Sequence, residues 1–125
     1  MNNIREIKNI EKNSTVFEST WVAFKGYLRI LRKETNIKIL TTMTLLVLAL
    51  ALYLKLAFLE IVFVTYLWLF TLILEINNTT FEEDIDFTGD NEFHPAIKKV
   101  KDYAAATVLL SSTFSIIVTL ICFLK

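Results

Sequence analysis

Three long apolar runs limit what this chain can fold into more than any other feature of its sequence. Residues 39–54 and 61–74 carry no charged side chain, and neither do residues 103–124. A helix needs roughly 20 apolar residues to cross a bilayer, and a lysine at its end can extend a shorter run to the interface. With two glycines and one proline in the whole chain, little interrupts these helices. The runs predict an all-α integral membrane fold with three transmembrane helices.

The predicted organisation is a single membrane domain that occupies the whole chain, residues 1–125. The wider apolar segment around the second run extends from about Leu56 to Ile76 and is interrupted by Glu60, which we place at the membrane interface where that helix begins. A loop is expected over residues 87–95, because Gly89 and Pro95 are typical of turns, and a new helix is expected from about Ala96. The predicted segments are transmembrane helices at about 39–54, 58–82 and 103–124, with a cytoplasmic helix end and loop at 83–97.

Residues 1–38 precede the first apolar run and are expected to form cytoplasmic or interfacial helices. Within them, residues 20–33 have helical spacing, with Trp21 and Phe24 on an apolar face and basic side chains over much of the remaining surface. A basic amphipathic helix with aromatic residues on its apolar side is typical of a helix lying in the membrane interface. Residues 2–13 are expected to form a second, weaker helix of the same kind.

Charge is strongly segregated along the chain, although its formal net charge is zero. Eight of the 13 lysines and arginines precede residue 39, whereas the acids concentrate between residues 82 and 92. Nucleic acid binding is not expected, because it needs a sustained basic face. Lysines and arginines in short loops mark the cytoplasmic side of a membrane protein. Their distribution predicts that the N-terminus and the acidic loop are both cytoplasmic.

A row of oxygen-bearing side chains extends from the end of the second apolar run. At about 100° of helical rotation per residue, Glu75, Asn78, Glu82 and Asp86 fall within roughly 80° of one another. Carboxylates at a membrane boundary need partners such as a cation, a metal or water, so such residues are a functional-site hypothesis by default. The alternative is an acidic helix end in water, which we favour for the neighbouring acids at 83 and 84.

Further polar residues are expected on the same cytoplasmic side of the membrane. Glu34 precedes the first span, while Lys98, Lys101 and Asp102 share one face where the third helix opens. Carboxylates that leave positions open for phosphate oxygens are the usual ligands of Mg²⁺. A lysine can neutralise charge on a transferred phosphoryl group, and a carboxylate can orient or deprotonate an attacking hydroxyl. Because the chain has no Walker sequence and no Gly-rich loop, a nucleotide site would be built from helix faces.

The same residues carry a resemblance to a known family over roughly residues 19–122. With these residues in family order, the chain resembles the prokaryotic diacylglycerol kinase and undecaprenol kinase family of small integral-membrane lipid kinases. The matching segments are Ser19…Ala23-Phe24-Lys25-Gly26, Glu34-Thr35-Asn36-Ile37-Lys38, Glu75-Ile76…Asn78-Thr79…Glu82…Asp86, and Phe93-His94-Pro95…Lys98…Lys101-Asp102…Ala104-Ala105. The chain departs from the family at Thr80 and Phe81, where small or aliphatic residues are usual, and in a loop before His94 that is one residue longer than in the enterobacterial-type enzymes.

The resemblance implies a homotrimer in the bacterial inner membrane, with active sites shared between neighbouring chains on the cytoplasmic side. The implied reaction transfers the γ-phosphoryl group of Mg-ATP to the hydroxyl of a membrane lipid. By carry-over, Glu75 would be the general base, Asn78 and Asp86 would orient the reacting groups, and Glu34 and Glu82 would hold Mg²⁺. The implied ATP-binding residues are Glu34, Glu82, Glu92, Phe93, His94, Lys101 and Asp102.

Several alternatives remain open from the sequence. His94 is as well suited to capping or turning the loop as to touching ATP. The lesser alternative for Glu34 is a solvated interfacial acid, and for Lys101 it is a positively charged membrane anchor. The lipid acceptor is undecaprenol or diacylglycerol, giving undecaprenyl phosphate or phosphatidic acid, and the His94-Pro95 pair and the residues after Lys101 favour undecaprenol. Other function classes are a transporter or channel subunit with a carboxylate relay, and a structural membrane protein.

Overall fold

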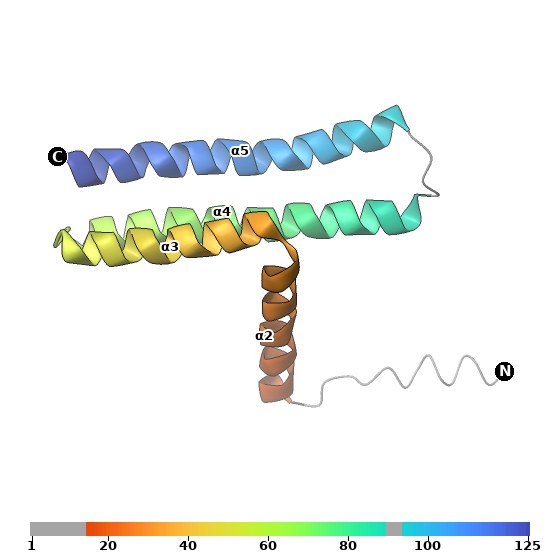
Figure 1. Cartoon of the computed structure of the whole chain (residues 1–125), viewed down its shortest axis with the longest axis horizontal. Helices are drawn as coiled ribbons and strands as arrows, with labels where there is room; N and C mark the ends of the chain where they lie inside the picture. The colour runs from red at the N-terminus through yellow and green to blue at the C-terminus, as the bar shows by residue number, and fades with distance from the viewer. Residues whose placement is uncertain (1–14, 90–93) are drawn as a thin grey trace. The chain divides into compact units, whose positions relative to one another are not determined.

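The computed structural model describes residues 15–89 and 94–125, and within these ranges it is entirely helical. Four helices follow one another along the chain (Figure 1): α2 (Val16–Lys33), α3 (Thr35–Tyr53), α4 (Phe58–Thr88) and α5 (Pro95–Leu124). Three of them, α3 to α5, are long and apolar enough to cross a membrane. The predicted all-α integral membrane fold is therefore confirmed. The helix predicted over residues 2–13 lies outside the described residues.

Helix α2 forms a unit by itself and begins earlier than the sequence pattern predicts. The hydroxyl of Thr15 accepts a hydrogen bond from the Glu18 backbone N–H at 3.2 Å, which is the bond of an N-cap residue. This cap starts the helix at Val16 rather than near residue 20. None of the residues of α2 is buried within the chain. On its surface the rings of Trp21 and Phe24 stack at 6.0 Å, and the Lys25 ammonium lies 5.4 Å from the Trp21 ring.

The second unit contains α3, α4 and α5, with α4 packed against both of the other helices. Figure 1 shows α4 and α5 side by side along their length, with α3 beside only the first part of α4. All three reach beyond the uncharged runs, because a helix that crosses a bilayer can continue into water. Helix α3 begins at Thr35 rather than 39. Helix α5 begins at Pro95, one residue before the expected helix start at Ala96 and ahead of the uncharged run from 103. Its proline lies in the first turn, where the missing N–H costs nothing. Helix α4 extends to Thr88, so the loop predicted from residue 87 begins two residues too early.

The turn between α3 and α4 reverses the chain through a single left-handed residue, Lys55, at φ 54°. The Lys55 N–H donates to the Leu52 carbonyl at 3.1 Å, and the Leu56 N–H donates to the Ala51 carbonyl at 3.1 Å. This pair of bonds is the Schellman motif that commonly ends helices. Helix α4 then begins with the Glu60 carboxylate accepting from the Ala57 N–H. Glu60 also pairs with Lys125 after the end of α5, so it lies at the helix start, where the sequence placed it.

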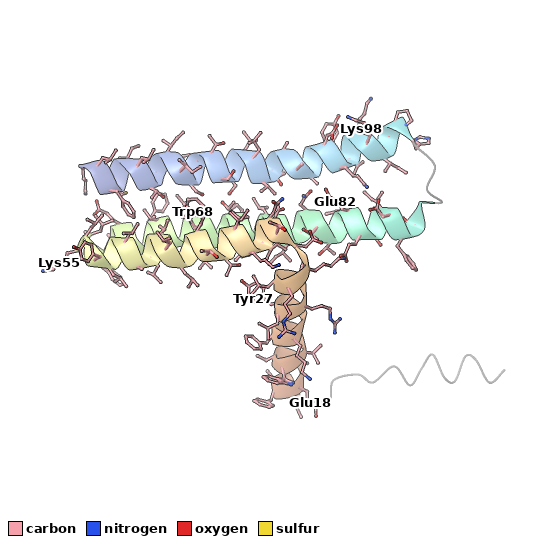
Figure 2. The ribbon with its side chains drawn as sticks, in the orientation of Figure 1. Glu18, Tyr27, Lys55, Trp68, Glu82 and Lys98 are labelled. Atoms are coloured by element: carbon pink, nitrogen blue, oxygen red, sulfur yellow. The ribbon has the colours of Figure 1, made fainter. Side chains whose placement is uncertain are left out.

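Apolar packing and buried hydroxyls join the three helices. Val47, Val64 and Trp68 form the core, and Figure 2 shows Trp68 on α4. The Trp68 indole donates to the Thr119 hydroxyl at 2.9 Å. The fully buried Thr71 hydroxyl contacts two serine hydroxyls of α5, at 2.7 Å and 3.1 Å. Hydroxyl bonds between close-packed helices are a usual means of association in a bilayer, and here they fix the register of α4 against α5.

Candidate functional site

The predicted row of polar side chains lies on one uninterrupted stretch of α4. Glu75 and Asn78 are buried, with 5% and 9% of their surfaces exposed. Glu82 and Asp86, one and two turns further along, are exposed. Figure 2 shows Glu82 on this half of α4. The row therefore runs from an enclosed end among the packed helices to an open end, so that one helix face joins an apolar environment to a polar one.

Glu75 is the enclosed end of this row and has a hydrogen-bond partner on another helix. The Asn36 side-chain amide in the first turn of α3 donates to Glu75 Oε1 at 3.0 Å. Burying a carboxylate is costly unless it is hydrogen-bonded, so this bond contributes to holding Glu75 where it is. A cavity of about 220 Å³ lies beside the pair and is lined by residues of all three helices. Its lining consists of Asn36, Ile39, Leu40, Glu75, Val108 and Ser112.

Asn36 is a residue of this site that the sequence pattern does not single out. The uncharged run begins at residue 39, so Asn36 was expected to precede the first span. In the structure Glu34 is the N-cap of α3, in extended conformation, and the helix begins immediately after it. The face of α3 that packs on α4 is identified by the buried residues Ile37 and Thr44 of the structure, so the sequence alone held no signal for the contact of Asn36.

Asn78 lies one turn from both Glu75 and Glu82, and its side chain has an unused acceptor. The Oδ1 atom is buried and has no hydrogen-bond partner among residues 15–89 and 94–125. Buried polar atoms are nearly always paired in folded proteins, and an unpaired one calls for an explanation such as an unseen ion or water. The amide oxygen is thus an available hard ligand or acceptor in the middle of the row.

Two ion pairs lie at the open end of the row. Lys101 of α5 contacts Asp86 of α4 at 2.5 Å, and Lys98 contacts Asp102 one turn along α5 at 3.0 Å. The predicted proximity of Lys98 and Asp102 on one face is therefore observed. The Asp86–Lys101 contact brings the opening of α5 to the end of the α4 row. Exposed pairs of this kind contribute about 0–1 kcal/mol to stability, so their main consequence is the position of Lys101.

Two other predicted nucleotide-binding residues, His94 and Glu34, lie at the starts of helices. His94 is the N-cap of α5, and its Nδ1 atom accepts a hydrogen bond from the Ala96 N–H at 3.2 Å, which is the capping alternative raised from the sequence. Glu34 is half-buried before α3, and its carbonyl accepts from the Lys38 N–H at 3.2 Å. Glu92 and Phe93 lie outside the described residues, so their predicted ATP contacts stay predictions.

The polar residues of the row can be compared with the ligands that Mg²⁺ usually takes. Over the described ranges, no group of three or more His, Cys, Asp or Glu side chains could hold a metal ion. Mg²⁺ is usually bound by one or two carboxylates together with substrate phosphates and water. The exposed Glu82 carboxylate and the unpaired Asn78 oxygen are hard donors of that type. Glu34, the other predicted ligand, is the N-cap of the helix that carries Asn36.

Comparison with known proteins places these residues in a family. The family model for prokaryotic diacylglycerol kinase matches residues 21–123. Two curated relatives, both named diacylglycerol kinase, come from Helicobacter pylori strains 26695 and J99 and are 34% and 33% identical over 82 residues. Each match covers 66% of this chain and 63% of the relative, so it spans less than two thirds of the relative's length. No solved structure matches the chain.

Proposed function

This chain belongs to the prokaryotic diacylglycerol kinase family, and from that premise we propose that it is an ATP-dependent lipid kinase. The reaction is transfer of the γ-phosphoryl group of Mg-ATP to the hydroxyl of a membrane lipid. Among the acceptors, we propose undecaprenol ahead of diacylglycerol, on the His94-Pro95 pair and the residues that follow Lys101. The proposed setting is a homotrimer in the bacterial inner membrane with a cytoplasmic N-terminus.

The observation that carries the proposal is a buried carboxylate at the edge of an apolar cavity. Glu75 lines the 220 Å³ cavity together with the aliphatic side chains of Ile39, Leu40 and Val108. A lipid presents one polar group at the end of hydrocarbon, so its acceptor site needs apolar walls around a single polar contact. The other end of the row, at Glu82 and Asp86, is exposed and suits a water-soluble nucleotide. One helix face thus offers surfaces for both substrates.

The row also supplies the groups that phosphoryl transfer needs. In the proposed step, Glu75 takes the proton of the lipid hydroxyl while the hydroxyl oxygen attacks the γ-phosphorus. The bond from that phosphorus to the oxygen bridging it to the β-phosphate breaks, and ADP leaves with the bonding electrons. Positioning and electrostatics provide most of the catalysis in such reactions. Lys101 is held at the open end by Asp86 at 2.5 Å, and its ammonium group would also contact the nucleotide phosphates.

The remaining groups would bind and orient the reactants. Bound Mg²⁺ would neutralise charge on the phosphates, with Glu34 and Glu82 as its protein ligands. The Asn78 Oδ1 atom is buried and unpaired among the described residues, which supports its proposed role beside the reacting groups. A transport function would need ionisable groups along the membrane interior. The buried interhelical polar contacts of α4 and α5 there are hydroxyls and an indole, which favours the kinase.

A direct assay of lipid phosphorylation tests the proposed function. The purified chain, folded in detergent or nanodiscs, is given γ-labelled Mg-ATP with undecaprenol or diacylglycerol in separate reactions, and the lipid products are separated. We expect labelled undecaprenyl phosphate or phosphatidic acid, with the higher kcat/KM for undecaprenol. A folded chain that labels neither lipid would overturn the proposed function. Faster labelling of diacylglycerol would overturn only the order of the acceptors.

A further inference from the structure

We propose that Asn36 is a positioning residue for the reaction: its amide holds Oε1 of Glu75 so that Oε2 is presented to the acceptor hydroxyl in the cavity. The role rests on the proposed function, because it assigns a purpose to a bond made to the proposed base. The bond between the Asn36 amide and Glu75 Oε1 is 3.0 Å long and joins side chains 39 positions apart in the sequence. The bond joins α3 to α4 at the cavity edge.

The bond from Asn36 provides a hydrogen-bond donor to a buried carboxylate. Glu75 is buried, and a buried carboxylate without donors is strongly destabilising. Hydrogen bonds to an ionised acceptor are shorter and about twice as strong as neutral ones. Over the described ranges, Oε1 accepts from Asn36 and no bond is made to Oε2. One carboxylate oxygen is therefore held by Asn36, and the other makes no hydrogen bond within the described ranges.

The backbone that carries Asn36 is itself well fixed. Asn36 is the second residue of α3, between the N-cap Glu34 and the fully buried Ile37. The Ile37 carbonyl accepts from the hydroxyl of Thr41 at 2.7 Å one turn along. The Asn36 side chain is short but exposed, so its amide is placed by the fixed backbone together with the bond to Glu75. Asn36 can thus transmit the position of α3 to the Glu75 carboxylate.

A neutral amide at position 36 is a better donor to a general base than a cationic side chain would be. A lysine or arginine in the same position would form an ion pair with Glu75 and reduce its readiness to accept a proton. A neutral amide donor restricts the carboxylate without adding a full positive charge, so the group stays available as a general base. The other polar side chain in the cavity wall, Ser112, donates its hydroxyl to the Leu109 carbonyl at 3.0 Å and so does not compete for Glu75.

Removing the donor should affect turnover more than binding. A misplacement of a reacting group by about 1 Å can cost about 10²-fold in rate. We therefore expect Asn36→Leu, which keeps the approximate size and removes the donor, to lower kcat by about 10- to 100-fold. The KM values for Mg-ATP and for the lipid should change little, because Asn36 is proposed to act through Glu75. Asn36→Gln keeps an amide and should recover part of the lost kcat.

The experiment compares kcat and both KM values for wild type, Asn36→Leu and Asn36→Gln. The matched control is Asn77→Leu, the same change at an exposed position of α4 two residues from Glu75. A double-mutant cycle uses Glu75→Asp, whose carboxylate is one methylene shorter and so withdraws from the amide. In that background Asn36→Leu should cost much less than it costs in the wild type.

The possible outcomes separate this role from the proposed function. Wild-type protein that labels neither lipid overturns the function and the role together. Active wild type with an equally active Asn36→Leu variant overturns only the role, as does an equal loss in the wild-type and Glu75→Asp backgrounds. If Asn36→Leu does not fold, Asn36→Ala is measured instead, since it removes the amide donor without adding a charge beside Glu75. Failure of both variants to fold would make the amide structural and would also overturn the role.

Discussion

The buried hydroxyl of Thr71 gives the sharpest prediction about what holds the helices together. The Thr71 Oγ1 atom shares hydrogen bonds with Ser111 at 2.7 Å and with Ser115 at 3.1 Å, and it donates to the Leu67 carbonyl of its own helix at 3.0 Å. Thr71→Val replaces this hydroxyl by a methyl group of similar size. The change removes both bonds to α5 while the apolar contacts remain.

The magnitude follows from measured interhelical hydrogen bonds in membranes, which average about 0.6 kcal/mol and reach about 1.7 kcal/mol. Two such bonds predict a loss of about 1 kcal/mol in the free energy of unfolding, with an upper bound near 3 kcal/mol. Thr113→Val is the matched control, because Thr113 is exposed on α5 and its hydroxyl donates within its own helix to the Leu109 carbonyl at 2.7 Å. The control should change stability by only a few tenths of a kcal/mol.

Unfolding of both variants is measured by titration with a denaturing detergent in mixed micelles, followed by circular dichroism. The difference between Thr71→Val and Thr113→Val isolates the bonds between α4 and α5 from the bond that each threonine makes to its own helix. Equal stability of the two variants would refute the claim that these hydroxyls contribute to joining the helices. A Thr71→Val variant more stable than wild type would refute it more strongly.

Three further predictions concern the two ends of the molecule. Glu82→Gln should raise the Kd for Mg-ATP, measured by equilibrium binding, because Glu82 is a proposed Mg²⁺ ligand; unchanged binding would contradict that assignment. Lys101→Met should raise the KM for Mg-ATP more than the KM for the lipid, whereas Lys99→Met on the exposed surface of α5 should change neither; similar effects of the two would make Lys101 a general anchor. Lys55→Gly should raise the free energy of unfolding by up to about 1 kcal/mol, because glycine adopts φ 54° without steric cost; a less stable variant would show that the lysine side chain matters at this turn.

The sequence was sufficient for the membrane fold and for the row on α4 because both depend on strong local constraints. An uncharged run that crosses a bilayer has to be helical, and a helix fixes which side chains share a face. The row on α4 could be predicted without knowing where the neighbouring helices lie. Its members are Glu75, Asn78, Glu82 and Asp86. The helix ends could not be predicted as well as the spans. Each uncharged run stops at a charged residue, whereas the helices continue past such residues.

Contacts between helices could not be predicted from one sequence. The bond from Asn36 to Glu75 depends on how α3 is rotated against α4, and the pair of Lys101 with Asp86 depends on the register of α5. Thr71 and its serine partners lie in runs where hydroxyls are unremarkable, so nothing in the sequence shows which of them meet. These contacts follow from packing, which a periodic pattern does not specify.

The proposed role of Glu75 as the base of a lipid kinase is tested by the turnover of Glu75→Gln. The variant is nearly isosteric and cannot accept the proton, so we predict that lipid phosphorylation falls by at least about 10²-fold. Its Kd for Mg-ATP should stay close to that of the wild type. Glu83→Gln, the same change at an exposed neighbouring position, should retain activity. A folded Glu75→Gln variant that phosphorylates lipid at the wild-type rate would contradict the account.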